Sequence, residues 1–208
     1  NQDFESEAES LYRLASLAHY DGQPGDAFAI AVEARDFAMA HDVPLVVAWS
    51  LSLIGLVHSN SGNHSEALSC SLQALDCYRG TGHRIDEGNM LNTIASIYHE
   101  LGDTDRAIVN YEAAMNANAQ LNRPDFDAIT LANVASLRAE RGEFDTAIEI
   151  GERALALCRM HAVGFLPEVL AALAGAYGGR GEFDQARTLL NAALAMLDAS
   201  SVSFDDAV

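Results

Sequence analysis

Apolar residues recur along this chain at helical spacing, in segments that come in pairs around short polar turns. One pair has apolar positions at Leu91, Ile94, Ala95, Tyr98 and Leu101 before the turn, and at Ala107, Ile108, Tyr111, Ala114 and Met115 after it. Spacing of three and four residues predicts amphipathic helices. The turn begins with Gly102, whose left-handed backbone can end the first helix, and Asp103 or Thr104 can cap the second. The pattern therefore predicts a helical hairpin.

The same hairpin pattern returns about every 40 residues. Its turn glycines are Gly22, Gly62, Gly102, Gly142 and Gly181, and each is followed five residues later by an alanine: Ala27, Ala67, Ala107, Ala147 and Ala186. A fixed period of this size indicates a solenoid of stacked helical hairpins, in which each unit buries its apolar face against its neighbours. We therefore expect ten helices in five hairpins.

Breaks between the hairpins are also marked in the sequence. Pro44, Pro124 and Pro167 fall where the first helix of a new hairpin is expected, and Thr81-Gly82 marks the remaining joint. We predict a single domain over residues 1–198, with hairpins at about 5–40, 44–82, 84–122, 125–162 and 166–198. Residues 199–208 carry no helical apolar stripe and are expected to form a polar, acidic tail.

Charge narrows the range of partners. The chain has 208 residues, half of them hydrophobic, with 30 acidic residues against 12 basic ones and a net charge of −18. Such a charge repels phosphate, so direct binding to nucleic acid or an anionic membrane is not expected. Basic proteins are compatible partners, although acidity also simply keeps an alanine-rich solenoid in solution. No apolar run approaches the roughly 18 residues of a membrane span, and we expect a cytoplasmic protein.

The cysteines form no recognisable framework. Cys70 and Cys77 lie seven residues apart on one predicted helix, which separates their Cα atoms by about 10 Å, too far for a disulfide. Together with Cys158 they make an odd number, which is typical of a reducing compartment. The seven histidines match no common ligand spacing, so neither a metal nor another cofactor is expected.

The hairpins resemble tetratricopeptide repeats, whose pattern places large and small residues at fixed positions around the turn glycine. The third copy carries that pattern as Leu91, Ile94, Ala95, Tyr98, Gly102, Ala107, Tyr111 and Ala114, and the fifth as Leu170, Leu173, Ala174, Tyr177, Gly181, Phe183, Ala186, Leu190 and Ala193. The second and fourth copies depart from this family pattern at His58, His64, Ser71, Arg138 and Gly151. The period of about 40 is similar to the longer variety found in kinesin light chains and bacterial signalling proteins. A HEAT or armadillo array of similar period is disfavoured by the five-residue step from glycine to alanine.

This resemblance implies an all-α, right-handed solenoid that acts as a protein- or peptide-binding scaffold. The implied setting is the regulatory or sensory segment of a larger bacterial signalling protein, for example one with a diguanylate cyclase or DNA-binding domain. The sequence has no glycine-rich phosphate loop, nucleophile elbow or pair of catalytic acids. No catalytic residues are therefore assigned, and an enzyme is not expected.

In this family the first helix of each hairpin lines a concave groove, and its inner residues can be counted from the turn glycine. The predicted ligand-binding residues are Trp49, Ser52, Asn89, Asn92, Ser96, His99, Asn133 and Ser136. The same count places Ile129, Glu140, Glu168, Ala172 and Gly175 on the inner face of the last two hairpins. Asparagine can bond a peptide backbone through both its donor and its acceptor. The alternatives are that these polar residues are simply solvated, and that Trp49 belongs to the core.

The last helix is apolar on nearly every side. Its expected core stripe is Ala186, Leu189, Leu190, Ala193, Leu194 and Leu197, and its other faces carry Ala192, Ala195 and Met196. A terminal solenoid helix exposed to water should be polar on its outer face. An alternative function is therefore structural, namely self-association of the chain as a homodimer through this helix.

Overall fold

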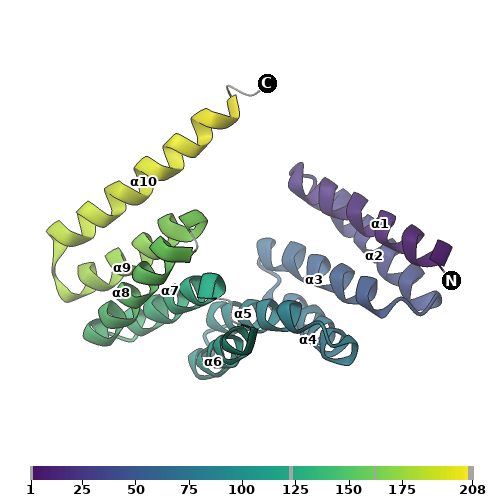
Figure 1. The fold of residues 1–208 in the computed structure, drawn as a ribbon, viewed down its shortest axis with the longest axis horizontal. Helices are drawn as coiled ribbons and strands as arrows, with labels where there is room; N and C mark the ends of the chain where they lie inside the picture. The colour runs from purple at the N-terminus through teal and green to yellow at the C-terminus, as the bar shows by residue number, and fades with distance from the viewer. Residues whose placement is uncertain (1, 122–123, 162, 206–208) are drawn as a thin grey trace. The chain divides into compact units, whose positions relative to one another are not determined.

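A computed structural model describes residues 2–121, 124–161 and 163–205. Within these ranges the chain forms ten α-helices and one short 3₁₀ helix (Figure 1). They are α1 (Gln2–Tyr20), α2 (Pro24–Ala40), α3 (Pro44–Asn60), α4 (His64–Thr81), α5 (Arg84–Glu100), α6 (Thr104–Leu121), α7 (Pro124–Glu140), α8 (Phe144–His161), η1 (Val163–Phe165), α9 (Leu166–Arg180) and α10 (Phe183–Asp205). The predicted all-α architecture of five hairpins is confirmed.

The chain divides into two compact units, Asn1–Ala117 and Asn118–Val208, with the boundary inside α6. Unit 1 holds α1 to α5 and most of α6, and unit 2 holds α7 to α10. Successive helices pack together from α1 to α5 in unit 1 and from α7 to α10 in unit 2. First helices of successive hairpins also meet, as α1 does with α3 and α7 with α9. The expectation of one domain over residues 1–198 stays a prediction.

The five turn glycines end the first helix of each hairpin as expected. Their φ angles lie between 71° and 91°, in the left-handed region that disfavours side chains. In the third hairpin the N–H of Asp103 reaches back to the carbonyl of Tyr98 at 2.8 Å, a Schellman-type closure. The Asp103 carboxylate then accepts from the backbone N–H of Arg106 at 3.0 Å. This bond caps α6 and lowers the pKa of Asp103.

The alanine five residues after each glycine lies where the two helices of a hairpin cross. Four of these alanines are 0% exposed and the last, Ala186, is 8% exposed. In unit 2, Ala147 belongs to a core cluster with Leu173, Ala174 and Ala186. A residue without a side chain beyond Cβ allows the backbones to approach closely, and larger residues on either side fill the remaining space.

Two departures from the repeat pattern have packing reasons. Gly151 stands where other copies carry a larger residue, and a Cβ atom built there would lie 2.8 Å from Cδ1 of Leu173. The missing side chain therefore makes room for α9 against α8. Arg138 replaces the usual tyrosine, and its Nη1 donates to Glu143 at 2.7 Å across the turn that follows.

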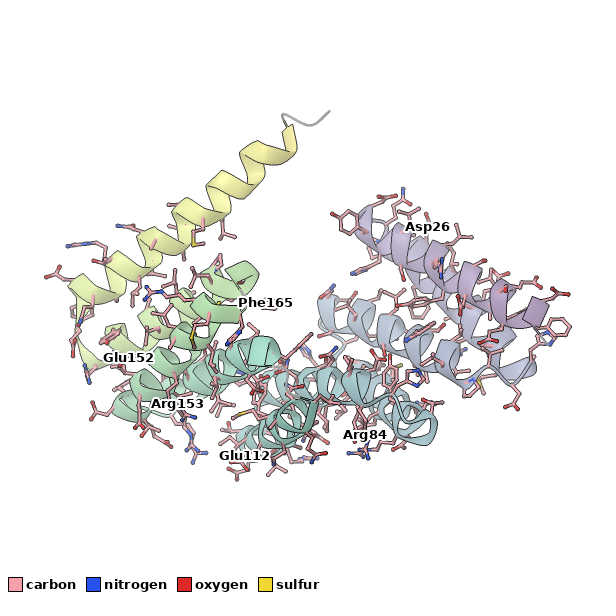
Figure 2. All side chains as sticks on the ribbon, in the orientation of Figure 1. Asp26, Arg84, Glu112, Glu152, Arg153 and Phe165 are labelled. Atoms are coloured by element: carbon pink, nitrogen blue, oxygen red, sulfur yellow. The ribbon has the colours of Figure 1, made fainter. Side chains whose placement is uncertain are left out.

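Polar links also join neighbouring helices. Glu87 of α5 is 8% exposed and pairs with Arg79 of α4 at 3.0 Å and with Arg84 at 3.1 Å. In unit 2 the hydroxyl of Tyr177 donates to Glu152 of α8 at 2.8 Å. Arg84 and Glu152 are labelled in Figure 2. These bonds fix α4 against α5 and α8 against α9 at positions where the apolar pattern is interrupted.

The structure corrects the sequence analysis at the last helix. α10 continues to Asp205, so residues 199–205, expected as a tail, are helical, while 206–208 lie outside the described residues. No glycine or proline falls within α10 to stop it, and each added residue gains a backbone hydrogen bond. Leu190, Leu194 and Leu197, expected in the core, are 45%, 57% and 50% exposed. They are exposed because no helix of unit 2 covers that face of α10 within the described residues.

Enlarging the crossing alanines tests the hairpin register. Replacing Ala147 with Leu, or Ala107 with Leu, should lower the free energy of unfolding by about 1–3 kcal/mol, because neither site has room for a larger side chain. Ala156 is an exposed alanine on the same helix as Ala147, so Ala156→Leu serves as the matched control. Urea denaturation measures all three. Equal stability of Ala147→Leu and Ala156→Leu would show that the crossing point is misplaced.

Candidate functional site

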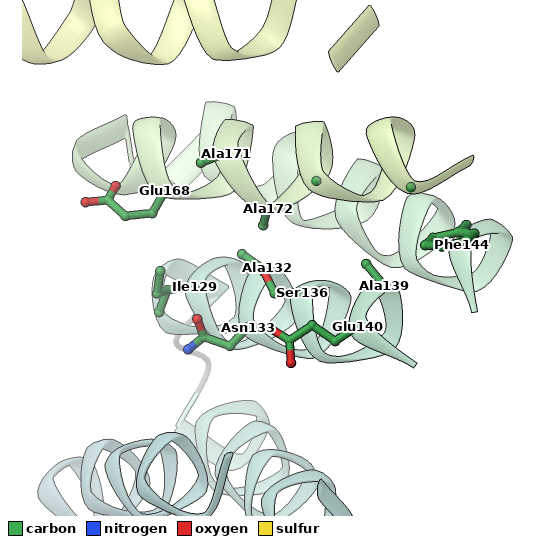
Figure 3. A pocket seen from close by; sticks show the side chains of 12 residues that line it. Ile129, Ala132, Asn133, Ser136, Ala139, Glu140, Phe144, Glu168, Ala171 and Ala172 are labelled. Atoms are coloured by element: carbon green, nitrogen blue, oxygen red, sulfur yellow. The ribbon is translucent and has the colours of Figure 1, made fainter. Parts of the chain in front are cut away.

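An open groove runs between α7 and α9 of unit 2 (Figure 3). Its volume is about 630 Å³. The lining residues come from three helices: Ile129, Ala132, Asn133, Ser136, Ala139 and Glu140 from α7, Phe144 from α8, and Glu168, Ala171, Ala172, Gly175 and Gly179 from α9. Half of them are alanine or glycine, so the floor lies close to the helix backbones. A cavity of this size is typical of small-ligand and peptide sites.

Phe144 closes one end of the groove. It is the first residue of α8, two positions after the turn glycine, and its ring packs on Gly179 of α9, where a Cβ atom would collide with the ring. Gly179 therefore has a packing role besides its place near the helix end. The contact joins the fourth hairpin to the fifth at the edge of the groove (Figure 3).

The groove carries acidic charge only. Glu140 and Glu168 are its two ionisable residues, and none of the lining residues is basic. Two arginines near the groove in sequence form ion pairs outside its lining: Arg138 with Glu143 at 2.7 Å, and Arg180 with Asp145 at 2.8 Å. The charged side chains that line the groove are therefore both acidic.

The inner-face count from the turn glycine is correct in unit 2. All seven residues that it placed on this side line the groove: Ile129, Asn133, Ser136, Glu140, Glu168, Ala172 and Gly175. Asn133 and Ser136, the two predicted ligand contacts among them, lie on α7 (Figure 3). The sequence analysis missed Phe144 as a wall, because the repeat pattern treats that position only as part of the turn. The sequence feature that could have identified this wall is the glycine pair at 178–179 on the facing helix, which leaves room for a large side chain.

Two of the predicted residues in unit 1 bond within their own hairpin. The hydroxyl of Ser52 on α3 lies 3.0 Å from the Tyr78 hydroxyl of α4, and that of Ser96 on α5 lies 3.0 Å from the Tyr111 hydroxyl of α6. Burial raises the pKa of Tyr78, so its phenol stays protonated at neutral pH. These serines therefore join the two helices of a hairpin.

Trp49 packs within unit 1 while staying half-exposed. Its ring lies 5.5 Å from that of Tyr12, centre to centre, and it borders a core cluster that contains Ala8, Ala38 and Val46. The aromatic pair joins α1 to α3, the two first helices. This contact supports the packing interpretation and leaves part of the indole accessible.

The remaining predicted residues, Asn89, Asn92 and His99, lie on α5 and are half-buried. Thr93 donates its hydroxyl to the carbonyl of Asn89 at 3.1 Å, a bond within the helix. Six of the eight predicted ligand contacts thus belong to unit 1 and two to unit 2. Binding by any of them stays a prediction.

Other chemistry is limited in the described part of the chain. Cys70, Cys77 and Cys158 are free thiols, and burial raises the pKa of each, which keeps them protonated and slow to react. No three His, Cys, Asp or Glu side chains among the described residues converge as metal ligands. Nor does any described helix combine the length and apolar character needed to cross a bilayer.

The architecture is that of a helical-repeat binding scaffold, and comparison with known families agrees. The tetratricopeptide repeat model matches residues 46–120 and 86–160, which together cover more than half of the chain. The chain belongs to the tetratricopeptide repeat family. The resemblance expected from the turn glycines and alanines is confirmed.

Two solved structures share the fold over most of this chain, and one curated relative matches half of it in sequence. A candidate kinesin light chain of Podosopora anserina with nearly identical TPR-like repeats has a TM-score of 0.71 at 18% identity, covering 95% of this chain and 97% of that one. NprR in complex with its cognate peptide NprX has a TM-score of 0.73 at 19% identity, covering 91% and 55%. Response regulator aspartate phosphatase H of Bacillus subtilis (strain 168) is 31% identical over 104 residues, which are 50% of this chain and 28% of that protein. The chain thus matches less than a third of this curated relative's length.

The Ser52–Tyr78 bond can be tested by a double-mutant cycle. Ser52→Ala and Tyr78→Phe should each destabilise unit 1, and their combined effect should fall short of the sum by about 0.5–1.5 kcal/mol, the usual worth of one hydrogen bond. Ser69→Ala, on the exposed side of α4, should change stability by less than about 0.5 kcal/mol. Urea denaturation gives the values. Strict additivity would mean that the Ser52 and Tyr78 hydroxyls contribute independently to stability.

Proposed function

We propose that this chain is a peptide-binding scaffold whose ligand lies in the groove of unit 2. The observation that carries the proposal is the groove itself. It is open, its alanine and glycine floor lets a peptide backbone come close, and Asn133 and Ser136 supply neutral hydrogen-bonding groups along one wall. A peptide in this position would be held by its main chain, with few demands on its side chains.

The relatives support a regulatory role of this kind. NprR is described in complex with a peptide, and the Bacillus subtilis relative is a response regulator aspartate phosphatase. We propose that the chain is likewise the sensory segment of a larger bacterial signalling protein in the cytoplasm. In this proposal the chain binds its ligand without catalysing a reaction.

Blocking the groove tests the proposal. Ala172 is a half-buried residue of the floor, and Ala172→Trp should fill the space above it. We expect octapeptides selected on the wild-type chain from a random display library to bind this variant at least tenfold more weakly, about 1.4 kcal/mol. Asn133→Ala should weaken them less, by about 0.5–1.5 kcal/mol for one hydrogen bond. Isothermal calorimetry measures both.

The control is an equally large change outside the groove. Ala156→Trp lies on the exposed face of α8 and should leave peptide affinity unchanged, provided that circular dichroism shows all variants folded. Peptides that bind wild type and Ala172→Trp equally would remove the groove from consideration.

A second candidate function is self-association through α10, which rests on its exposed leucines. Leu190 and Leu197 stand nine and sixteen residues after their turn glycine, and both are about half exposed. In the other four hairpins the same two positions are buried: Ala31, Ser71, Tyr111 and Gly151 at the first, and Ala38, Tyr78, Asn118 and Cys158 at the second. The covering contact is seen in α2 and α8, where Ala38 packs with Val46 and Gly151 meets Leu173 of the following hairpin.

Leu190, Leu194 and Leu197 form a stripe with spacings of four and three residues, which matches the seam of paired helices. We propose that a second copy of the chain covers this stripe with its own α10. Pairing of one face with itself closes on a twofold axis and gives a dimer rather than a fibre.

Charge on the stripe tests this dimer. Leu194→Glu and Leu197→Glu should each weaken association at least tenfold, about 1.4 kcal/mol, because each buries a carboxylate in an apolar seam. Met160→Glu, at a residue of α8 with 65% exposure, is the matched control and should have no effect. Sedimentation over a range of protein concentrations distinguishes the species. A wild-type chain that stays monomeric at the highest concentration would contradict self-association.

A further inference from the structure

One glycine of the groove in unit 2 has no packing role in the described part of the chain. Gly175 is an exposed residue inside α9, and it lines the groove. A Cβ atom built on it would meet no described atom within 4 Å outside its own stretch of helix, whereas one built on Gly179 would collide with the Phe144 ring. The chain therefore has room for a side chain at Gly175 and carries none.

This glycine weakens its helix without a contact that offsets the loss. Glycine is the poorest helix former after proline, because its backbone loses the most conformational freedom on folding. The other four hairpins carry a side chain at the same place, six residues before the turn glycine: Ser16, Leu56, Ser96 and Ser136. A helical glycine that no neighbour requires is typical of a place where a ligand comes close to the backbone.

The surroundings of Gly175 on its own helix are small and apolar. Ala172 precedes it by three residues and Gly179 follows it by four, so both share its face of α9, and both line the groove. The half-buried ring of Phe144 packs on Gly179 and closes this end of the groove (Figure 3). Bare backbone beside an aromatic wall leaves space that a bulky apolar side chain can fill, with a gain from buried area and from contact with the ring.

An exposed carboxylate lies at the other end of the same helix. Glu168 is in the first turn of α9, seven residues before Gly175, and also lines the groove. Seven residues correspond to about 10 Å along a helix at about 1.5 Å per residue. An extended peptide covers that distance in about three residues, at about 3.3 Å each. A basic side chain at that distance from the apolar one gains a charge-assisted hydrogen bond.

We infer that the groove recognises a peptide with a bulky apolar side chain over Gly175, against Phe144, and a basic residue about three positions away at Glu168. This inference rests on the proposed peptide-binding function and adds the class of ligand. Gly175 is then a specificity-determining residue, because any side chain there would take the place of the apolar group of the ligand.

The test begins with two parallel selections from a random octapeptide display library, one on the wild-type chain and one on Ala172→Trp. The pool enriched on wild type alone represents groove ligands. We expect it to carry an aromatic or large aliphatic residue at one position and Arg or Lys about three positions away. A groove-dependent pool without a bulky apolar residue would overturn the inference while leaving peptide binding in the groove intact.

The most enriched peptide is then titrated by fluorescence anisotropy against variants of the glycine. Gly175→Leu should weaken it by about tenfold or more, because the new side chain fills the space of the apolar group. Gly175→Ala should weaken it by about threefold and also raise the midpoint of urea denaturation, because alanine favours the helix. A purely structural role would not link lower affinity to higher stability.

The matched control is Gly178→Ala on the same helix. Gly178 does not line the groove, and its added Cβ atom would lie 3.8 Å from that of Ala186, an ordinary contact. This variant should leave peptide affinity unchanged. Replacing the bulky residue of the peptide with Ala should weaken binding to wild type by about tenfold and binding to Gly175→Leu much less, because that variant has already lost the contact.

The charged contact is tested with the same peptide. Glu168→Gln should weaken it about three- to tenfold, the effect of losing one partly solvated charge pair. Glu149→Gln, which removes an exposed carboxylate of α8 outside the groove lining, should leave affinity unchanged. Equal affinity for wild type and Glu168→Gln would refute the basic residue of the inferred ligand.

The remaining outcomes separate this inference from the proposed function. Equal affinity for wild type and Gly175→Leu, together with loss on Ala172→Trp, would refute the apolar contact at Gly175 alone. A selection that yields no pool dependent on Ala172 would refute peptide binding in the groove, and the inferred ligand with it.

Discussion

Close approach of two helices at an alanine is the contact on which every hairpin of this chain depends. The alanine follows its turn glycine by five residues, and it is almost fully buried in each of the five copies. The interval is short because the glycine adopts a left-handed φ, which reverses the chain and starts the second helix within three residues. Turn geometry and side-chain size thus act together, and neither would fix the crossing point alone.

That constraint also shapes the groove of unit 2, where we propose that a ligand binds. When the second helices occupy the crossing with their alanines, the first helices are left to contact one another, as α7 and α9 do. In unit 2 their inner positions are filled by small residues, two carboxylates and two neutral polar groups, and a groove results. In unit 1 Trp49 and Tyr12 pack together on the corresponding helices.

Most of the fold follows from the sequence because its signals are local and repeated. The turn glycines, the buried alanines and the inner face of α7 and α9 all depend on counting from one residue type. Counting from the turn glycine does not predict which partner a polar side chain hydrogen-bonds. Ser52 and Ser96 were expected to face a ligand, but their hydroxyls lie 3.0 Å from tyrosine hydroxyls of the adjacent helix. Nothing in the spacing distinguishes such a bond from an open one.

The last helix illustrates a different limit. The sequence analysis assigns its apolar residues to a core stripe from their helical spacing. Burial there requires a helix from the following hairpin, and the repeat pattern carries no information about whether one is present. Leu190, Leu194 and Leu197 are therefore exposed despite occupying core positions. In a solenoid, a residue on the face between two hairpins is buried only when the neighbouring hairpin packs on it. The sequence of one hairpin therefore predicts which of its faces is apolar, but not what covers that face.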